Sequence, residues 1–485
     1  MHIPTYLAYV RLPTEITDRL SYGENHPERE AFYATLNKAQ REGFQLRRLD
    51  SMAELIEDDV NLGKECPEQS VLYLGLEDIE PNTGKAVYES YLGKDIRSTA
   101  KRFHRGNIVF AGLRPYLNKA HLIQVEEGVG SSELFVILPD KKQVIPQFLL
   151  KYLLSDIVLS QTKWILTGSS YPRLNVEDFK NLQVILPIDK TGQAAILQHL
   201  RPLEQEAETE EAEAKRLDRE GRNIILDKLG IPLSSEETRN YFFKTGDEAH
   251  ALWFAIPPFE ITDRLHYLFF NPRYRALKTL CDRFSTVPLG TICREPIVRG
   301  EQPDYDESGA VAVLKTVDLR DGYIDYDNTL RVSEDFFRSH PTAHVLKDDI
   351  LIASTGYVSM GKVDIYDRDE PAMVDGHISI VRLNKEYDPH FIAYFLRCHF
   401  GWLQFEKWFT GSSGQIELQP TDLGKFIVPD NSDNGFPIKE QKRISTLVTE
   451  HLKASLDFER KAKAKWQEVE RIFTEMILGF NPVDF

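Results

Sequence analysis

The chain has little cysteine and no long apolar run. Its four cysteines, Cys66, Cys281, Cys293 and Cys398, are scattered and form no Cys-x-x-Cys pair. This spacing indicates neither a zinc site nor a disulfide framework, and a reducing cytoplasm is the expected compartment. No stretch of about 18 apolar residues is present, so we expect no membrane-spanning helix. The first residues also lack the basic region and apolar core of a secretory signal.

Complete catalytic motifs are missing as well. The string nearest to the Asn-Pro-Pro-Tyr-like motif of DNA methyl transfer is Asn271–Tyr274, which lacks the second proline. The chain has no phosphate-binding Gly-x-x-x-x-Gly-Lys-Ser/Thr loop, no Gly-x-Ser-x-Gly frame and no Asp-x-Glu-x-Lys-like nuclease cluster. His340 and His344 have the spacing of a helical metal pair, but no glutamate lies between them. We therefore expect no catalytic residues, no metal and no cofactor.

The net charge of −16 argues at first against a nucleic-acid partner, because phosphates repel an acidic surface. The charges are unevenly distributed, however. Acids are dense in Glu204–Glu213, whereas Lys94–Lys119 holds seven lysines and arginines against the single acid Asp95. This basic stretch has two interpretations, which are a solvated face or a surface that contacts phosphates and base edges.

The sequence is repeated internally. Glu15–Tyr22 and Glu260–Tyr267 agree at seven of eight positions with an offset of 260 − 15 = 245. Thr167–Pro187 and Thr410–Pro429 both begin with Thr-Gly-Ser-Ser and end in an apolar run closed by proline, with an offset of 410 − 167 = 243. A chain of 485 residues is long enough for two to four units. These landmarks predict two halves built to one plan.

Each half has short strand-like runs and a few helical patterns, which predicts α+β domains. We expect single helices over Ile145–Thr162 and Pro389–Lys407, where apolar residues recur at helical spacing. Each half then leads into a long charged pattern, Gln193–Leu229 or Gln441–Leu478, with apolar residues three, four and seven apart. The glycine that follows each pattern, at position 230 or 479, is expected to end the helix.

The order of these features resembles the specificity subunit of type I restriction–modification systems. The resemblance is carried by the duplicated Thr-Gly-Ser-Ser segments and by Val71–Gly84, VLYLGLEDIEPNTG, a strand followed by a turn. It implies target-recognition domains over residues 1–187 and 245–430, alternating with spacer helices over 188–235 and 436–480. The two helices would pack as an antiparallel coiled coil.

The resemblance also implies a function. The chain would be a non-catalytic subunit that reads a bipartite, asymmetric site in double-stranded DNA. It would dock DNA methyltransferase (modification) subunits and join a motor–nuclease (restriction) subunit. From the residues alone, the two helices also fit a plain intramolecular coiled coil.

The predicted DNA-binding residues lie in the basic stretch, in the loops Gly112–Lys119 and Ile350–Lys362, and around the Thr-Gly-Ser-Ser turns. An arginine can pair with guanine and an asparagine with adenine, and serines can bind phosphate. The turns have a second interpretation, as simple connections between elements. The candidates in the first half are Arg97, Lys101, Arg102, Arg105, Arg114, Tyr116, Asn118, Lys119, Ser169, Ser170 and Arg173. Those in the second half are Thr355, Tyr357, Lys362, Ser412, Ser413 and Gln415.

Two other functions remain open at this point. One is a self-contained DNA-modifying or DNA-cleaving enzyme with a degenerate active site, against which the incomplete motifs speak. The other is a protein–protein scaffold without DNA binding, which the acidic net charge would suit.

Overall fold

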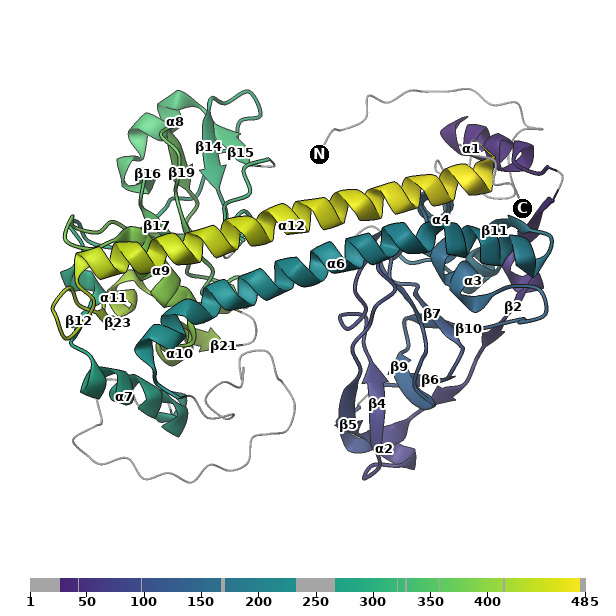
Figure 1. Ribbon diagram of the computed structural model, residues 1–485, viewed down its shortest axis with the longest axis horizontal. Coiled ribbons are helices and arrows are strands. Elements are labelled where there is room, and N and C mark those ends of the chain that lie inside the picture. The colour runs from purple at the N-terminus through teal and green to yellow at the C-terminus, as the bar shows by residue number, and fades with distance from the viewer. Residues whose placement is uncertain are drawn as a thin grey trace. The chain divides into compact units, whose positions relative to one another are not determined.

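The computed structural model describes residues 27–41, 43–96, 98–166, 171–232, 267–320, 322–327, 329–356, 358–412 and 415–479. The chain divides into two compact units (Figure 1). The first unit comprises Met1–Thr209 with Lys461–Phe485, and the second comprises Glu210–Arg460. Both units are α+β, as the sequence predicts. The paired sequence Glu15–Tyr22 and most of its repeat lie outside the described residues.

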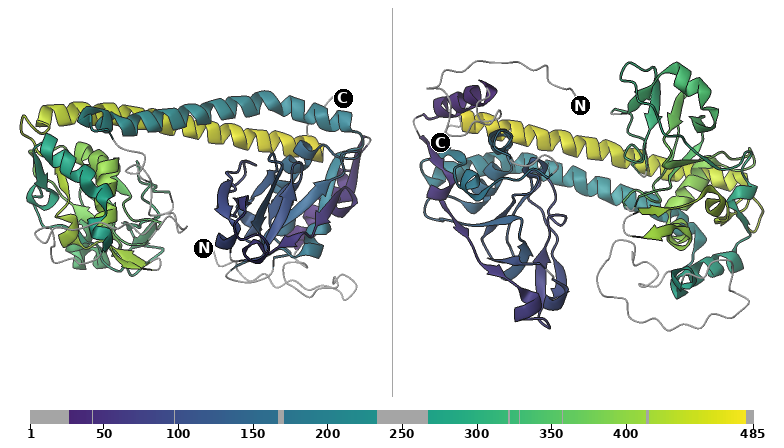
Figure 2. Two further views of the ribbon diagram at one scale, coloured as in Figure 1. Left: turned by 90° about the horizontal axis from the view of Figure 1, so that it is seen from below. Right: turned by 180° about the vertical axis from the view of Figure 1, so that it is seen from behind.

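The strands of the first unit pair in the orders β1–β11, β2–β10–β7–β8 and β3–β6–β9–β4–β5. Strands β7 and β10 are apolar runs that are buried almost throughout, as expected for strands covered on both faces. Figure 2 shows the strands of this unit gathered on one side of its helix segments. The strands are β1 (Phe44–Arg48), β2 (Ala53–Ile56), β3 (Asp59–Val60), β4 (Ser70–Leu74), β5 (Glu89–Leu92), β6 (Ala100–His104), β7 (Ile108–Ala111), β8 (Ala120–Leu122), β9 (Glu127–Ser131), β10 (Leu134–Pro139) and β11 (Gln183–Pro187).

The second unit repeats the order of these sheets, except that β3 has no counterpart among its described strands and that it adds the pair β21–β22. Its orders β12–β23, β13–β20–β17–β18 and β15–β14–β19–β16 match β1–β11, β2–β10–β7–β8 and β5–β4–β9–β6. The parallel pair β4–β9 has its counterpart in the parallel pair β14–β19. The strands are β12 (Thr286–Pro288), β13 (Val298–Arg299), β14 (Val311–Leu314), β15 (Leu330–Val332), β16 (His344–Val345), β17 (Ile350–Ala353), β18 (Val363–Ile365), β19 (Ala372–Val374), β20 (Ile378–Val381), β21 (Thr410–Ser412), β22 (Gln415–Glu417) and β23 (Ile427–Pro429). The predicted repeat is therefore confirmed at the level of sheet order.

The shorter helices differ from the prediction in one respect. Each expected single helix is broken in two, because Ser155 and Cys398 have extended backbones between consecutive helices. In the first unit the Ser155 hydroxyl also donates to the Tyr152 carbonyl at 2.6 Å. The helices are α1 (Pro27–Lys38), α2 (Leu62–Glu65), α3 (Pro146–Leu153), α4 (Asp156–Thr162) and α5 (Val176–Lys180) in the first unit, and α7 (Arg275–Arg283), α8 (Glu334–Ser339), α9 (Pro389–Arg397), α10 (His399–Trp408) and α11 (Pro420–Leu423) in the second.

The two long helices are α6 (Lys190–Leu229) and α12 (Ile438–Leu478). Each ends at a glycine with a left-handed backbone, Gly230 with φ 58° and Gly479 with φ 88°, as the sequence predicts. No helix in the described part of the chain has an apolar stretch long enough to cross a bilayer.

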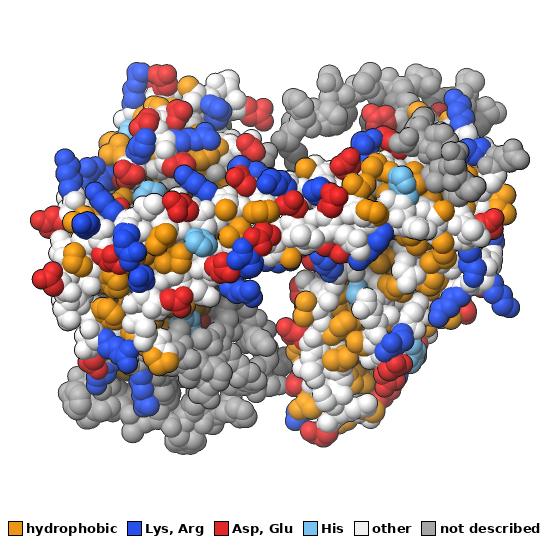
Figure 3. Space-filling view, viewed as in Figure 1, with side chains coloured by type: hydrophobic (Ala, Val, Ile, Leu, Met, Phe, Trp, Pro, Cys, Tyr) orange, Lys and Arg blue, Asp and Glu red, His pale blue; other side chains and the backbone are white. Residues whose placement is uncertain are grey.

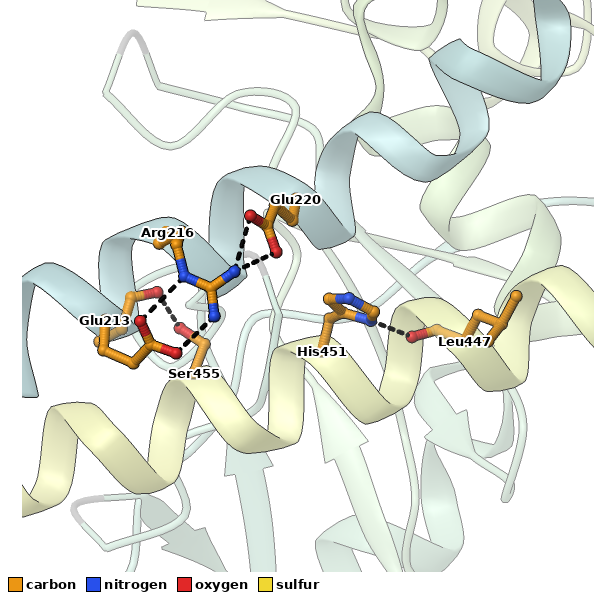
Figure 4. Close-up of polar contacts among 7 residues, drawn as sticks. Glu213, Arg216, Glu220, Leu447, His451 and Ser455 are labelled. Atoms are coloured by element: carbon orange, nitrogen blue, oxygen red, sulfur yellow. Dashed lines mark hydrogen bonds and ion pairs between the residues drawn. The ribbon is translucent and has the colours of Figure 1, made fainter.

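The long helices pair in opposite directions within each unit. In the first unit, Glu206 in the first half of α6 forms an ion pair with Lys465 in the second half of α12. In the second unit, the Ser455 hydroxyl donates to the Ala214 carbonyl at 2.8 Å, which joins the later part of α6 to the earlier part of α12 (Figure 4). Buried side chains follow the shared seam, including Ala207 and Val469. The predicted antiparallel packing is confirmed.

Both cores include side chains of the long helices. In the first unit, Phe473 of α12 packs edge-on against Phe148 and Tyr152 of α3, with ring centroids 5.9 and 6.4 Å apart. In the second unit, Ile225 of α6 and Val448 of α12 belong to one cluster with the residues of α9. Each helix thus supplies apolar area to both units.

Two pairs of buried glutamines fix the elements in equivalent ways. Gln161 of α4 accepts from the Gln183 backbone N–H at 2.7 Å and donates to its carbonyl at 2.9 Å. Gln404 of α10 makes the same two bonds with Ile427 at the start of β23. Both side chains are fully buried.

The second pair, Gln193 and Gln441, attaches each long helix to its unit. Gln193 accepts from the N–H of Ile145, just before α3, at 2.8 Å, and Gln441 accepts from Asp388, just before α9, at 2.9 Å. Both side chains are 0% exposed.

We expect the substitution Gln161→Leu to lower the free energy of unfolding by about 1–3 kcal/mol, because it leaves a buried N–H and a buried carbonyl without partners. Gln404→Leu should cost a similar amount. Chemical denaturation monitored by circular dichroism measures both. The exposed Gln198 on α6 provides the control, since Gln198→Leu should leave stability nearly unchanged. Equal stability of all three variants would contradict this account of the glutamines.

Candidate functional site

In the first unit, the loop that follows β7 lies against the segment that follows the Thr-Gly-Ser-Ser turn. We call Gly112–Lys119 the first variable loop. Its Arg114 N–H donates to the Pro172 carbonyl at 2.7 Å, and the Leu174 N–H donates back to Gly112 at 2.9 Å. Leu113 and Arg173 form an antiparallel bridge. Two sequence-predicted segments about 60 residues apart are thus brought together, although residues 167–170, with Ser169 and Ser170, lie outside the described part.

The first variable loop has a strained backbone. Arg114 and Asn118 both adopt the left-handed conformation, with φ 49° and 52°, on either side of the single turn Pro115–Leu117. A residue with a Cβ rarely adopts this conformation, and such strain is concentrated at functional sites. The turn exposes Tyr116, whose side chain is 53% accessible.

Arg114 and Tyr171 form the aromatic and cationic part of this surface. The Arg114 guanidinium lies 4.9 Å from the centroid of the Tyr171 ring, and Tyr171 is 57% exposed. The Arg114 Nε is buried and has no hydrogen-bond partner among the described residues. A guanidinium stacked on a ring is held in orientation and keeps donors for a planar acceptor. Tyr171 was not among our predicted residues, although it stands directly after the Thr-Gly-Ser-Ser turn.

Two predicted residues of this loop are engaged inside the unit instead. Asn118 is 2% exposed, and its amide donates to the Asn82 side chain at 2.9 Å and to the Leu154 carbonyl at 2.5 Å. Lys119 donates to the Leu76 carbonyl at 2.6 Å. Both side chains therefore help to close the loop onto its own unit, with Asn118 buried and Lys119 partly exposed.

Arg173 and the basic stretch are mostly paired with acids. Arg173 forms two bonds with Glu133, at 2.9 and 3.1 Å, and these hydrogen bonds raise the pKa of Arg173. Arg102 faces Asp58 at 3.5 Å, and Arg105 faces Glu126 at 2.8 Å. Arg105 precedes β7 and Arg114 follows it, so these two arginines lie at opposite ends of the strand.

Lys101 of β6 is half-buried and lies 5.8 Å from the Phe135 ring centroid. Arg97 lies outside the described residues.

The second unit repeats the arrangement with different side chains. We call Ser354–Lys362 the second variable loop. Its Gly356 N–H donates to Ile416 at 3.1 Å, Leu418 donates to Ser354 at 2.9 Å, and Thr355 bridges Glu417. Thr355 is hydrogen-bonded through its hydroxyl to His377 at 2.7 Å. Glu417 accepts from Arg299, and this hydrogen bond lowers the pKa of Glu417.

The other predicted residues of the second unit contribute less to the described surface. Lys362 donates to the Thr316 carbonyl at 3.4 Å, in the manner of Lys119 in the first unit. Ser412 and Gln415 face each other in the β21–β22 hairpin, which is described at the level of the backbone. Tyr357 and Ser413 lie outside the described residues.

Two strings that could suggest catalysis have structural roles. Arg273 of the Asn271–Tyr274 string forms a buried ion pair with Glu406 of α10 at 3.1 Å, with both side chains 4% exposed. His340 and His344 stack on Phe336 and Phe337 instead of converging. Within the described ranges, no group of three or more histidine, cysteine, aspartate or glutamate side chains could hold a metal ion.

Comparison with known proteins identifies one family. Residues 79–219 match the model of the type I restriction modification DNA specificity domain. This range contains the first variable loop, Tyr171, Arg173 and the whole first-unit part of α6. The resemblance seen in the sequence is confirmed there. No curated protein matches the chain.

Solved structures of related systems also resemble the chain. A chain from a study of complex assembly and conformational transition of the type I R-M system is 18% identical, with a TM-score of 0.41 over 90% of this chain and 97% of that one. The HsdS subunit from Thermoanaerobacter tengcongensis is 16% identical, with a TM-score of 0.36 and coverages of 90% and 97%. The type I restriction–modification S subunit from M. genitalium is 16% identical, with a TM-score of 0.39 and coverages of 91% and 97%. Because these identities are low, the family match is the similarity that bears on function.

Proposed function

We propose that this chain is the DNA-recognition subunit of a type I restriction–modification complex. Each unit reads one half of a bipartite, asymmetric site in double-stranded DNA, and the chain itself performs no catalysis. The observation that carries the proposal is the family match over residues 79–219, which includes the first variable loop and the segment packed against it. The second unit is included because it repeats the same topology and the same pairing of loop and segment.

The differences between the two loops support separate targets. Arg114, Tyr116 and Tyr171 form an aromatic and cationic surface in the first unit. In the second unit, Gly356 makes the backbone bond that Arg114 makes in the first, and the neighbouring Thr355 is bonded to His377. Arginine pairs best with guanine, while a hydroxyl or an imidazole makes other contacts. We therefore expect the two half-sites to differ in sequence, so that the whole site is asymmetric.

The acidic net charge is compatible with this function because the acids of the long helices are largely paired. Arg216 bonds to Glu213 and Glu220 (Figure 4). Glu204 pairs with Lys151 at 2.6 Å. Lysines and arginines are interleaved with acids along both long helices on the face seen in Figure 3. Such a surface suits docking of partner subunits. We propose DNA methyltransferase subunits as these partners, together with a motor–nuclease subunit.

The competing assignment is a self-contained DNA-modifying or DNA-cleaving enzyme. We expect the purified chain, incubated with DNA and labelled S-adenosylmethionine, to transfer no methyl groups, and incubated with DNA and ATP to make no cuts. Both activities should appear only when the partner subunits are added. Turnover that persists after rigorous removal of the partners would support the enzyme instead.

The role of the first variable loop is tested by two substitutions in the assembled complex. Arg114→Ala should cost about 1–3 kcal/mol of binding at one position of the first half-site, because a bidentate base contact is lost. Lys101→Ala should weaken all sequences alike and reduce the salt slope by about one unit, as expected for a phosphate contact. Fluorescence anisotropy over a salt series and a panel of single-base variants distinguishes the two. If both variants keep the affinity, sequence preference and salt slope of the wild type, this surface does not bind DNA.

The length of the paired helices should set the distance between half-sites. Inserting seven residues after Ala212 of α6 and seven after Asp457 of α12 preserves the phase of the apolar seam. The insertion lengthens both helices by about 10.5 Å. The two half-sites should then move apart by about three base pairs, at about 3.4 Å each, while keeping their bases. Methylation mapping reads the gap directly, and an unchanged gap with retained activity would assign the spacing to the partner subunits.

A further inference from the structure

The first unit contains a hollow behind the first variable loop, lined by both charged and apolar side chains. It has a volume of about 780 Å³ and lies between α3, the start of α4 and the paired segments of α6 and α12. We call it the junction hollow. The residues that matter for its chemistry are Asn118, Lys151, Asp156, Glu204, Trp466 and Glu470.

The junction hollow has an excess of acid. Glu470 accepts from the Asp156 N–H at 2.9 Å and from the Thr474 hydroxyl at 3.1 Å, and both donors are neutral. Lys151 is committed to Glu204 at 2.6 Å. Burial, together with the nearby charge of Asp156, raises the pKa of Glu470 to about 7. A cation bound beside Glu470 would stabilise its ionised form.

A second and independent feature points to a hydrogen-bond donor as the ligand. Asn118 lines the hollow and is 2% exposed. Its amide nitrogen makes both of its donations within the unit, to Asn82 and to the Leu154 carbonyl. Its Oδ1 is buried and accepts no hydrogen bond from the described residues. A buried acceptor without a donor costs free energy, which a ligand N–H group would recover.

The repeat shows what occupies the equivalent place in the second unit. Gln193 and Gln441, which attach the long helices, are equivalent residues whose numbers differ by 441 − 193 = 248. The same difference makes Arg222 of α6 the equivalent of Glu470 of α12, since 470 − 222 = 248. On the shorter elements, Leu154 corresponds to Arg397, since 397 − 154 = 243.

Arg222 and Arg397 both line the matching junction of the second unit, which is closed to about 10 Å³. The Arg397 guanidinium lies 5.5 Å from the Tyr394 ring centroid. Two arginines of the chain thus line the place where the first unit has an open, acidic hollow, and Arg222 is bonded to Asp218 of its own helix at 2.8 Å.

We propose that the junction hollow binds a guanidinium group from a ligand outside this chain. A guanidinium carries a fixed positive charge for Glu470 and several N–H donors, one of which can serve Asn118 Oδ1. The Trp466 indole, which Lys85 and Lys151 approach at 5.9 Å, forms an aromatic wall suited to a planar cation. The guanidinium group belongs either to a small guanidine compound or to the arginine side chain of a protein. Its binding to the junction hollow does not require DNA.

Calorimetric titration of the purified full-length chain tests the proposal with two probes. Agmatine represents a small guanidine compound, and N-acetyl-arginine amide represents an arginine side chain. We expect saturable binding to one site for at least one probe. If agmatine alone binds, the ligand of the site is a small dication. If both probes bind, the site also accepts the arginine side chain of a protein. If neither probe binds saturably to the wild-type chain, the proposal is wrong.

Three variants locate the binding. Glu470→Gln retains an acceptor for Asp156 and Thr474 but removes the charge, so the affinity should fall by about tenfold or more. Glu470→Arg introduces the residue type found at the equivalent position of the second unit and should abolish binding. Glu468→Gln removes the same charge from an exposed position on the same helix and should leave the affinity unchanged. Equal affinity in all three variants would place the binding elsewhere and overturn the proposal.

Discussion

The packing of both long helices into both cores is the constraint on which the rest of the structure depends. Ile196 and Phe473 belong to the core of the first unit, and Ile225 and Val448 belong to that of the second. Burying each such side chain contributes about 1.5–3 kcal/mol relative to leaving it exposed. Gln193 and Gln441 add a directional attachment at the start of each helix. Neither unit has a complete core without the helices, so the helices are part of each unit and also connect the two.

A constant framework and variable loops follow from this organisation. The attachments of α4 and α10 through Gln161 and Gln404, and the closure of each variable loop by Lys119 or Lys362, recur in both units. The exposed side chains of the loops do not recur. Under the proposed function this division is useful, because the framework places each loop while the loop side chains determine the bases.

The elements with strong periodic patterns could be predicted from the sequence. The seams of α6 and α12 repeat over many turns and end at glycine, so their last residues, Leu229 and Leu478, were found correctly. The breaks at Ser155 and Cys398 were missed, because apolar residues continue across both positions and conceal the extended backbone.

The site could be predicted only in part. The pairing of the two variable loops with the segments that follow the two Thr-Gly-Ser-Ser sequences depends on tertiary contacts that no local pattern encodes. The sequence predicts DNA contacts for Asn118 and Lys119 because both stand in the basic stretch of a repeated domain. No local pattern shows that the side chains of Asn118 and Lys119 also bond to backbone carbonyls of their own unit. Tyr171 was overlooked although its neighbours were singled out.

The measurement that tests the central claim most directly is selection of binding sites from a random DNA library by the assembled complex. The proposed function, in which each unit reads one half-site, predicts a motif with two defined halves of different sequence and a gap of fixed length and unspecified sequence. A single continuous motif would contradict the account, and so would enrichment of no sequence at all by a complex shown to contain the folded chain.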